Sequence, residues 1–296
     1  MSISLRVTER SMSTQSLNGL QGSLGRLSQL QQQLSSGKVL SRPSDNPSDA
    51  FAAMGVRSQI RMQQQYSRNA QDGIGWLGTQ DQSLSSGLDQ IRQARDLVVQ
   101  GMSSGSTGPD AQAALAAQVD SIRQSLLQTA NSSYLGRPVF GGTTSGQVAY
   151  SPAGVYVGDA NAVDRSVGDT ATVRVDTTGP QVFGTGSGQL FTILTDLTAD
   201  FTANPAALGA DLDRLDAATR TVTAQLADVG ARYSRVMSMS QAADDRVLAL
   251  TGQLSALEDV DLPKTITELN LQQTSYQAAL SVTAKVLQPS LVDFLR

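Results

Sequence analysis

The sequence predicts a mainly α-helical protein with a small β insert. Long antiparallel helices should form a coiled-coil rod, and the two ends of the chain should form a second coiled coil. Three observations lead to this fold. A heptad pattern keeps its phase near the C-terminus, apolar stripes recur at helical spacing in the first half, and residues 135–188 change to glycine, threonine and alternating valine.

The heptad pattern lies in the last third of the chain. Alternate steps of four and three residues from Leu208 meet an apolar or aromatic side chain at thirteen of fifteen positions. Asn204 and Pro205 mark the start, as a cap residue followed by proline in the first turn. A helix this long, on the order of 75 Å, needs other helices beside it. The fifteen positions are Leu208, Leu212, Leu215, Thr219, Val222, Leu226, Val229, Tyr233, Val236, Ser240, Ala243, Val247, Leu250, Leu254 and Leu257.

The first half of the chain supplies candidate partner helices. One apolar stripe predicts a helix over residues 47–101, and a second predicts a shorter helix after residues 105–109. Gly73, Gly75 and Gly78 lie inside the longer helix, where each costs about 1 kcal/mol relative to alanine. Either a kink or a close helix contact would account for them. The stripes are formed by Leu77, Leu84, Leu88, Ile91 and Val98, and by Leu115, Val119, Ile122 and Leu126.

Residues 135–188 predict short strands and turns, as in "VAYSPAGVYVG" and "TATVRVDTTG". Because helices flank this region on both sides, we expect a small, outward-facing β-rich domain at the far end of a helical hairpin. A short helix over residues 190–201 should lead back. The helical rod domain would then comprise residues 42–134 and 189–261.

The two ends of the chain form a separate pair in this prediction. Each end alone is a marginal amphipathic helix, because an isolated helix in water gains too little from propensity. The pattern allows either an ordinary intramolecular pair or packing against copies in neighbouring subunits. We assign residues 1–41 and 262–296 to this terminal coiled-coil domain. The candidate packing residues are Leu17, Leu20, Leu24, Leu27, Leu34, Ile266, Leu269, Tyr276, Leu280, Leu287 and Phe294.

Two breaks separate the terminal helices from the long ones. In the first, glycine suits a left-handed helix end, and an Asn-Pro pair suits the start of the next helix. The second lies in "LEDVDLPK". Breaks that face each other across two antiparallel helices predict a joint that lets a subunit adjust its bend. The predicted hinge residues are Gly37, Pro43, Asn46, Pro47, Asp261 and Pro263.

Composition argues against most enzyme and binding classes. The formal charge is -4 and the basic residues are scattered, so nothing favours nucleic acid or an anionic membrane as a partner. The chain has no cysteine and no histidine, which excludes disulfides, zinc sites built on those residues and any triad with imidazole.

The remaining candidate motifs are weak. "GTGSG" at residues 184–188 lacks the Lys-Ser/Thr ending of a phosphate loop, and Asp211, Asp213 and Asp216 suit the dipole of a helix start better than a metal. We therefore expect no catalytic residue, cofactor or metal site. The first residues lack the apolar core of a cleaved signal peptide, and no uncharged apolar run approaches the roughly 20 residues that cross a bilayer.

Both ends of the chain carry motifs of a known family. "LSSGKVLSRPSDNPSDA", with the later "QDG" at residues 71–73, resembles the N-terminal half of bacterial flagellins and their junction relatives. "LEDVDLPKTITELNLQQTSYQAALSVTAKVLQPSLVDFL" resembles their C-terminal segment, and the resemblance covers about residues 1–142 and 205–296. "RVTERSM", "GRPVFGGT" and "YQAALSVTAKVLQPSLVDFL" are closer to the proteins of the hook-filament junction than to flagellin.

The resemblance implies a secreted structural protein of the flagellum. Such a chain is exported unfolded through the flagellar type III pathway, and its terminal helices, disordered in the monomer, order on assembly. The implied partners are copies of itself in a ring, hook-associated protein 1 on the hook side, flagellin, and an export chaperone that holds the C-terminal part. The implied site is the hook-filament junction.

Three alternative functions lead to different expectations. A flagellin would assemble into long filaments alone, whereas a junction protein should not. An enzyme inserted in the β region would need catalytic groups that the composition does not offer. A cytoplasmic coiled-coil adaptor would stay in the cell, with helices ordered to both ends.

Overall fold

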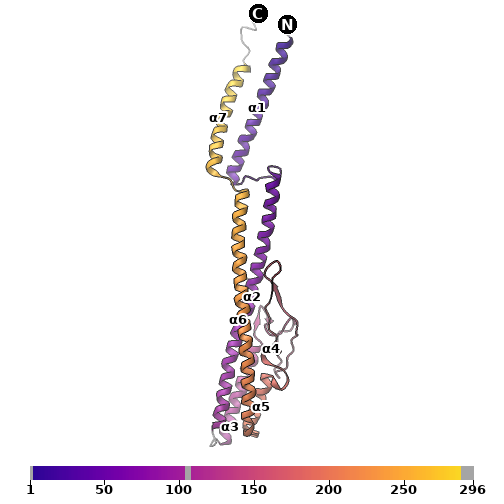
Figure 1. Ribbon diagram of the computed structural model, residues 1–296, viewed down its shortest axis with the longest axis vertical. Helices are drawn as coiled ribbons and strands as arrows, with labels where there is room; N and C mark the ends of the chain where they lie inside the picture. The colour runs from indigo at the N-terminus through magenta and orange to yellow at the C-terminus, as the bar shows by residue number, and fades with distance from the viewer. Residues whose placement is uncertain (1–2, 104–107, 288–296) are drawn as a thin grey trace. The chain divides into compact units, whose positions relative to one another are not determined.

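The computed structural model describes residues 3–103 and 108–287. It divides into two compact units, which we call the terminal unit (Met1–Arg61 with Leu248–Arg296) and the central unit (Met62–Val247). Two long helices, α2 (Pro47–Ser103) and α6 (Leu208–Glu258), contribute residues to both units (Figure 1). None of the helices in the described ranges combines the length and hydropathy that a bilayer crossing requires.

The long helices turn their predicted apolar faces inward. All fifteen heptad positions of α6 are buried or half-buried. The predicted pattern of long helices with an apolar inner face is therefore confirmed. In the central unit the most deeply buried members are Leu208, Leu215, Val222, Val229 and Val236 on α6, and Leu77, Leu84, Leu88, Ile91 and Val98 on α2.

Two shorter helices complete the helical core of the central unit. α3 (Pro109–Ala130) packs against α5 (Leu190–Ala203), close to the bounds expected from the sequence. Phe201 of α5 is fully buried and lies so close to Gly101 of α2 that a Cβ there would come within 2.4 Å of its ring. The short elements α4 (Gly179–Phe183), η1 (Gly186–Gly188) and η2 (Pro205–Ala207) connect these helices to their neighbours.

Residues 131–188, which we call the β region, contain two small antiparallel sheets. β1 (Ser133–Tyr134) pairs with β2 (Arg137–Pro138), and β3 (Asp164–Ser166) pairs with β4 (Thr172–Arg174). Short strands and turns were expected here, and the described residues contain them. The strands are shorter than the valine pattern suggests.

Side chains take over much of the hydrogen bonding that strands would otherwise provide. Asn131 Oδ1 accepts hydrogen bonds from the backbone N–H groups of Ala149 (2.9 Å) and Tyr150 (2.8 Å). Its Nδ2 donates to Tyr150 O at 2.9 Å. One amide side chain therefore makes the hydrogen bonds to this backbone that a neighbouring strand would otherwise make.

The β region lies beside the middle of α2 and α6, and the prediction that it sits at the far end of the helical hairpin is wrong. Arg165 Nε donates to Asp72 Oδ2 of α2 at 2.6 Å, and Arg232 Nη1 of α6 donates to Asp176 O at 2.8 Å. The reason is α3, whose 22 residues return the chain by about 33 Å before the β region begins.

The glycines inside α2 are explained by close contacts. α2 continues as one helix through Gly73, Gly75 and Gly78. A Cβ at Gly75 would lie 2.4 Å from Tyr134 Oη, and one at Gly73 would lie 3.1 Å from Val175 Cγ1. The close helix contact expected from the sequence is present but looser, because side chains of α6 come no nearer than 3.5 Å (Val236) and 3.7 Å (Tyr233) to a Cβ at Gly73 and Gly78. The tightest contacts are with the β region, which the sequence did not predict. Gly73 and Gly75 therefore form a seat, a stretch of α2 without side chains, on which the β region packs.

The terminal unit holds the two terminal helices. α1 (Ile3–Ser36) and α7 (Leu262–Leu287) lie side by side and run in opposite directions (Figure 1). Gln272 Nε2 of α7 donates to Ser23 O of α1 at 3.2 Å. The segments that connect α1 to α2 and α6 to α7, residues 37–46 and 259–261, also belong to this unit, and we call them the joint.

Candidate assembly interface

Buried and half-buried side chains mark the inner face of each terminal helix. Both faces follow alternate steps of four and three residues, the spacing of a coiled-coil seam. Serine, threonine and glutamine occupy five of the twelve positions, so the pair buries little apolar surface by itself. The inner face of α1 is Ser16, Leu20, Ser23, Leu27, Leu30 and Leu34, and that of α7 is Thr265, Leu269, Gln272, Tyr276, Ala279 and Thr283.

The structure brings five of the predicted packing residues onto these inner faces. Leu20, Leu27 and Leu34 recur at seven-residue intervals on α1, and Leu269 and Tyr276 do so on α7. All five are half-buried, and no more than that.

The other predicted packing residues do not lie on the inner faces between α1 and α7. Leu24 is 50% exposed and Ile266 is 48% exposed, although both belong to the stripes read from the sequence. Leu287 ends α7 but its side chain lies outside the described part, as does Phe294 altogether. The exposed predicted residues are Leu17, Leu24, Ile266 and Leu280.

Sequence reasoning missed apolar residues on a further side of α7. Leu271 is 68% exposed and Val282 is 61% exposed, more than any predicted residue of the helix. They were overlooked because they do not fall on the four-and-three spacing chosen for α7. On α1 the chosen spacing passed through Gln31, whereas the structure turns Leu30 inward. A helix with apolar residues on several sides needs more than one neighbour.

The first break has the local structure that its residues predict. Gly37 adopts a left-handed conformation (φ 69°), and its N–H donates to Gln33 O at 2.9 Å, which ends α1. Asp49 N donates to Asn46 Oδ1 at 3.3 Å, and Pro47 is the first residue of α2.

The second break is capped in the same way. Lys264 N donates to Asp261 Oδ1 at 3.1 Å, and Pro263 lies in the first turn of α7. Pro43, on the exposed turn of the first break, lines a shallow pocket with Leu40 and Met54. These caps fix where α1 ends and where α2 and α7 begin, and movement about the joint remains a prediction.

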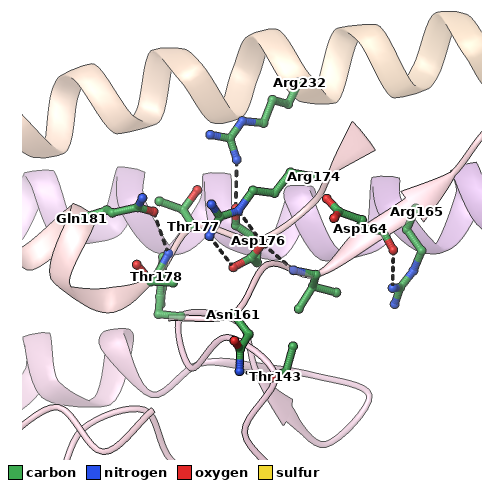
Figure 2. Close-up of polar contacts among 12 residues, drawn as sticks. Thr143, Asn161, Asp164, Arg165, Arg174, Asp176, Thr177, Thr178, Gln181 and Arg232 are labelled. Carbon is green, nitrogen blue, oxygen red and sulfur yellow. Dashed lines mark hydrogen bonds and ion pairs between the residues drawn. The ribbon is translucent and has the colours of Figure 1, made fainter. Parts of the chain in front are cut away.

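A buried aspartate, Asp176, links the β region to α6 through its backbone oxygen and braces the β region through its carboxylate (Figure 2). Asp176 is fully buried, and its Oδ1 accepts hydrogen bonds from Val163 N and from Arg174 Nε, both at 2.8 Å. The hydrogen bond to Asp176 raises the pKa of Arg174. The backbone oxygen of Asp176 accepts a hydrogen bond from Arg232 of α6. Asp176 thus joins β4, the residue before β3 and a long helix. A weak signal of this role is present in "VRVDTTG", where an aspartate directly follows alternating valines.

The acidic residues at the start of α6 do more than complement the helix dipole. Asp211 Oδ1 accepts from Arg214 Nη1 at 2.8 Å, and Asp216 Oδ1 accepts from Arg95 Nε at 2.8 Å. Within residues 3–103 and 108–287, no three acidic side chains gather in a way that could hold a metal ion.

Replacing Asp211 with asparagine should stabilise the central unit at neutral pH by about 1 kcal/mol. Asp211 is buried, and Oδ2 has no hydrogen-bond partner among the described residues. Burial raises the pKa of Asp211, and the neighbouring Asp200 acts in the same direction. A raised pKa means that the stabilising protonated form prevails at low pH and is lost as pH rises. Urea unfolding should therefore show a gain at pH 7 that disappears near pH 3.

The control for this prediction is Asp213→Asn, an exposed neighbour on the same helix. It should leave stability unchanged within about 0.5 kcal/mol at both pH values. An Asp211→Asn variant less stable than the parent at pH 7 would show that the charge on Asp211 is needed by Arg214.

Comparison with known proteins identifies relatives over most of the chain. The bacterial flagellin N-terminal helical region matches residues 7–145, and the bacterial flagellin C-terminal helical region matches residues 212–295. Flagellar hook-associated protein 3 of Escherichia coli (strain K12) is 28% identical, with 93% of this chain and 95% of that protein aligned. Flagellin of Bacillus subtilis (strain 168) is 26% identical, with 96% and 97% aligned.

Solved structures share the fold. A putative flagellar hook-associated protein from Vibrio parahaemolyticus superposes with a TM-score of 0.66 at 19% identity, over 73% of this chain and 100% of that one. Bacillus cereus FlgL gives a TM-score of 0.59 at 18% identity, over 69% and 99%. With both helical regions matched in the expected order, the chain belongs to the bacterial flagellin family.

Proposed function

We propose that the chain is a structural component of the bacterial flagellum that joins the hook to the filament. The observation that carries this function is the alignment of nearly the whole chain with flagellar hook-associated protein 3 of Escherichia coli. The flagellin of Bacillus subtilis aligns over a similar length, so a filament subunit is the second candidate. The junction-like segments "RVTERSM" and "GRPVFGGT" favour the first.

The terminal helices would carry the assembly. Leu17, Leu24, Ile266 and Leu280 are exposed beside a pair whose inner faces are partly polar, so copies of the chain in a ring could cover them. In this proposal folding and binding of the terminal helices are coupled. The neighbours above and below would be hook-associated protein 1 and flagellin.

Delivery to the flagellum would use the type III pathway. The chain has no cysteine, so no disulfide would obstruct passage of an unfolded polypeptide. An export chaperone would hold the C-terminal part, where exposed apolar residues such as Leu271 and Val282 are concentrated.

Replacing Leu24 and Ile266 together with glutamine should abolish assembly and leave the central unit intact. Glutamine keeps the helix propensity of the two positions and removes their apolar surface. We expect the double variant to be exported but not incorporated into flagella, while the stability of the central unit changes by less than about 0.5 kcal/mol. Labelled protein counted on purified hooks would measure incorporation.

The matched control is Met237→Gln, which removes an equally exposed side chain (50%) from α6 in the central unit. This variant should assemble normally. Normal assembly of the Leu24→Gln, Ile266→Gln double variant would contradict a role for the outer stripes of the terminal helices.

Electron microscopy of cells lacking the gene would test the junction role itself. Hooks without filaments, together with flagellin monomer in the medium, would support it, because the filament would lack its foundation. Loss of the filament protein itself, with nothing shed, would identify the chain as a flagellin. Intact, working flagella would reject both.

A further inference from the structure

The two connecting segments of the joint pair with each other. Val39 N donates to Glu258 O at 2.6 Å, and Val260 N donates to Gly37 O at 3.0 Å. Lys38 and Asp259 face each other between these bonds as an isolated antiparallel bridge. The two segments of the joint are therefore paired through one bridge, which we call the crossing, and are not separate linkers. A pair of strands this short is marginal in water without further support.

Charged side chains supply that support. The Glu258 side chain is only 5% exposed, and its Oε2 lies 2.8 Å from Arg57 Nη2 and 3.5 Å from Lys38 Nζ. Lys38 Nζ also lies 2.5 Å from Asp259 Oδ1, and Ser255 donates a hydrogen bond to the other oxygen of that carboxylate. Two cations thus hold one buried carboxylate at the point where the segments cross.

The charges act on each other in the direction that the geometry implies. The hydrogen bond from Lys38 lowers the pKa of Asp259, with Ser255 adding to the effect. The hydrogen bond to Asp259 raises the pKa of Lys38. A buried carboxylate that lost its cations would be left uncompensated, which is the costly case for a buried charge.

We propose that Glu258, held by Lys38 and Arg57, is an ionic latch that keeps the joint closed in the free chain. In the free chain the ordered part would then begin at Gly37. This moves the boundary of the terminal domain, which the sequence placed after residue 41. Opening the joint requires Glu258 to leave its two cations. The joint therefore stays closed until that cluster is broken, whichever flagellar structure the subunit builds.

Hydrogen exchange at two amides tests the latch in the free, full-length chain. Val39 and Val260 donate the two hydrogen bonds of the crossing, so their exchange reports its opening. In the parent protein at low ionic strength both amides should be protected. Glu258→Gln keeps the size of the side chain and removes its charge, and it should speed exchange at both amides about tenfold. About 0.5 M salt should speed exchange more in the parent than in this variant, because salt screens the exposed Lys38.

The matched control removes an exposed ion pair elsewhere. Arg92 and Asp89 form a pair at 3.0 Å on α2, with both side chains about two-thirds in solvent, so Arg92→Gln should not change exchange at the joint. The amide of Val229 in the middle of α6 serves as the internal reference. If Glu258→Gln also speeds exchange at Val229, then Arg57→Gln replaces it, with the same expected result at the joint.

Three results would overturn the proposal. The first is exchange of Val39 and Val260 in the parent at the rate of an unfolded peptide. The second is unchanged exchange in both the Glu258→Gln and the Arg57→Gln variants. The third is an equal effect of Arg92→Gln.

Discussion

Replacing Asp176 with alanine is expected to destabilise the central unit by about 3 kcal/mol. The substitution removes a fully buried carboxylate and leaves two donors, Val163 N and Arg174 Nε, without their acceptor (Figure 2). Val163 is itself buried, so its N–H cannot turn to water. The fluorescence of Trp76, the single tryptophan of the chain, would follow unfolding in urea from within the central unit.

Two variants separate the causes of this loss. Asp176→Asn keeps an oxygen that can accept from Val163 N and should cost about 1 kcal/mol. Asp164→Ala removes an exposed carboxylate from the strand that pairs with Arg174, and should cost less than about 0.5 kcal/mol. Equal losses for Asp176→Ala and Asp164→Ala would show that burial of Asp176 is unimportant.

Replacing Gly75 with alanine should destabilise the central unit by about 2 kcal/mol, although alanine is the better helix former. The added Cβ would lie between 2.4 and 2.7 Å from three atoms of the Tyr134 side chain. Relief of this overlap must move Tyr134, which also packs edge-on against Trp76 with ring centroids 6.0 Å apart. The emission of Trp76 in the folded protein should therefore shift along with the stability.

Gly55→Ala is the control in the same helix. A Cβ at Gly55 meets nothing within 4 Å, so the substitution should leave the contacts intact and stabilise the helix by about 0.5–1 kcal/mol. If Gly75→Ala stabilised the protein as Gly55→Ala does, the glycine would have no role as a seat for Tyr134.

The long helices could be predicted from sequence because their signal is local and repeated. Each turn of α6 adds another apolar residue in phase, so the pattern from Leu208 to Leu257 fixed both the extent and the inward face of the helix. The ends followed from residues whose backbone preferences are strong, such as Gly37 and Pro47.

The position of the β region could not be predicted in the same way. Its contacts join residues far apart in sequence, and no local pattern states that Arg165 will meet Asp72 or that Tyr134 will cover Gly75. The glycines did indicate a close contact with α2, but a helix was expected there and the β region makes the tightest contacts. For the terminal helices the spacing identified apolar stripes, but only the structure separated Leu20 and Leu27, which face α7, from Leu17 and Leu24, which do not.

The long-range bonds of the β region also bear on the order in which the chain can fold. Arg165 meets a residue 93 positions earlier, and Asp176 meets Arg232, 56 positions later. Contacts of this kind form late, because the loops between them must close first. α2 and α3 depend on local hydrogen bonds and can form early, whereas the β region must wait for Arg232 before its last anchor exists.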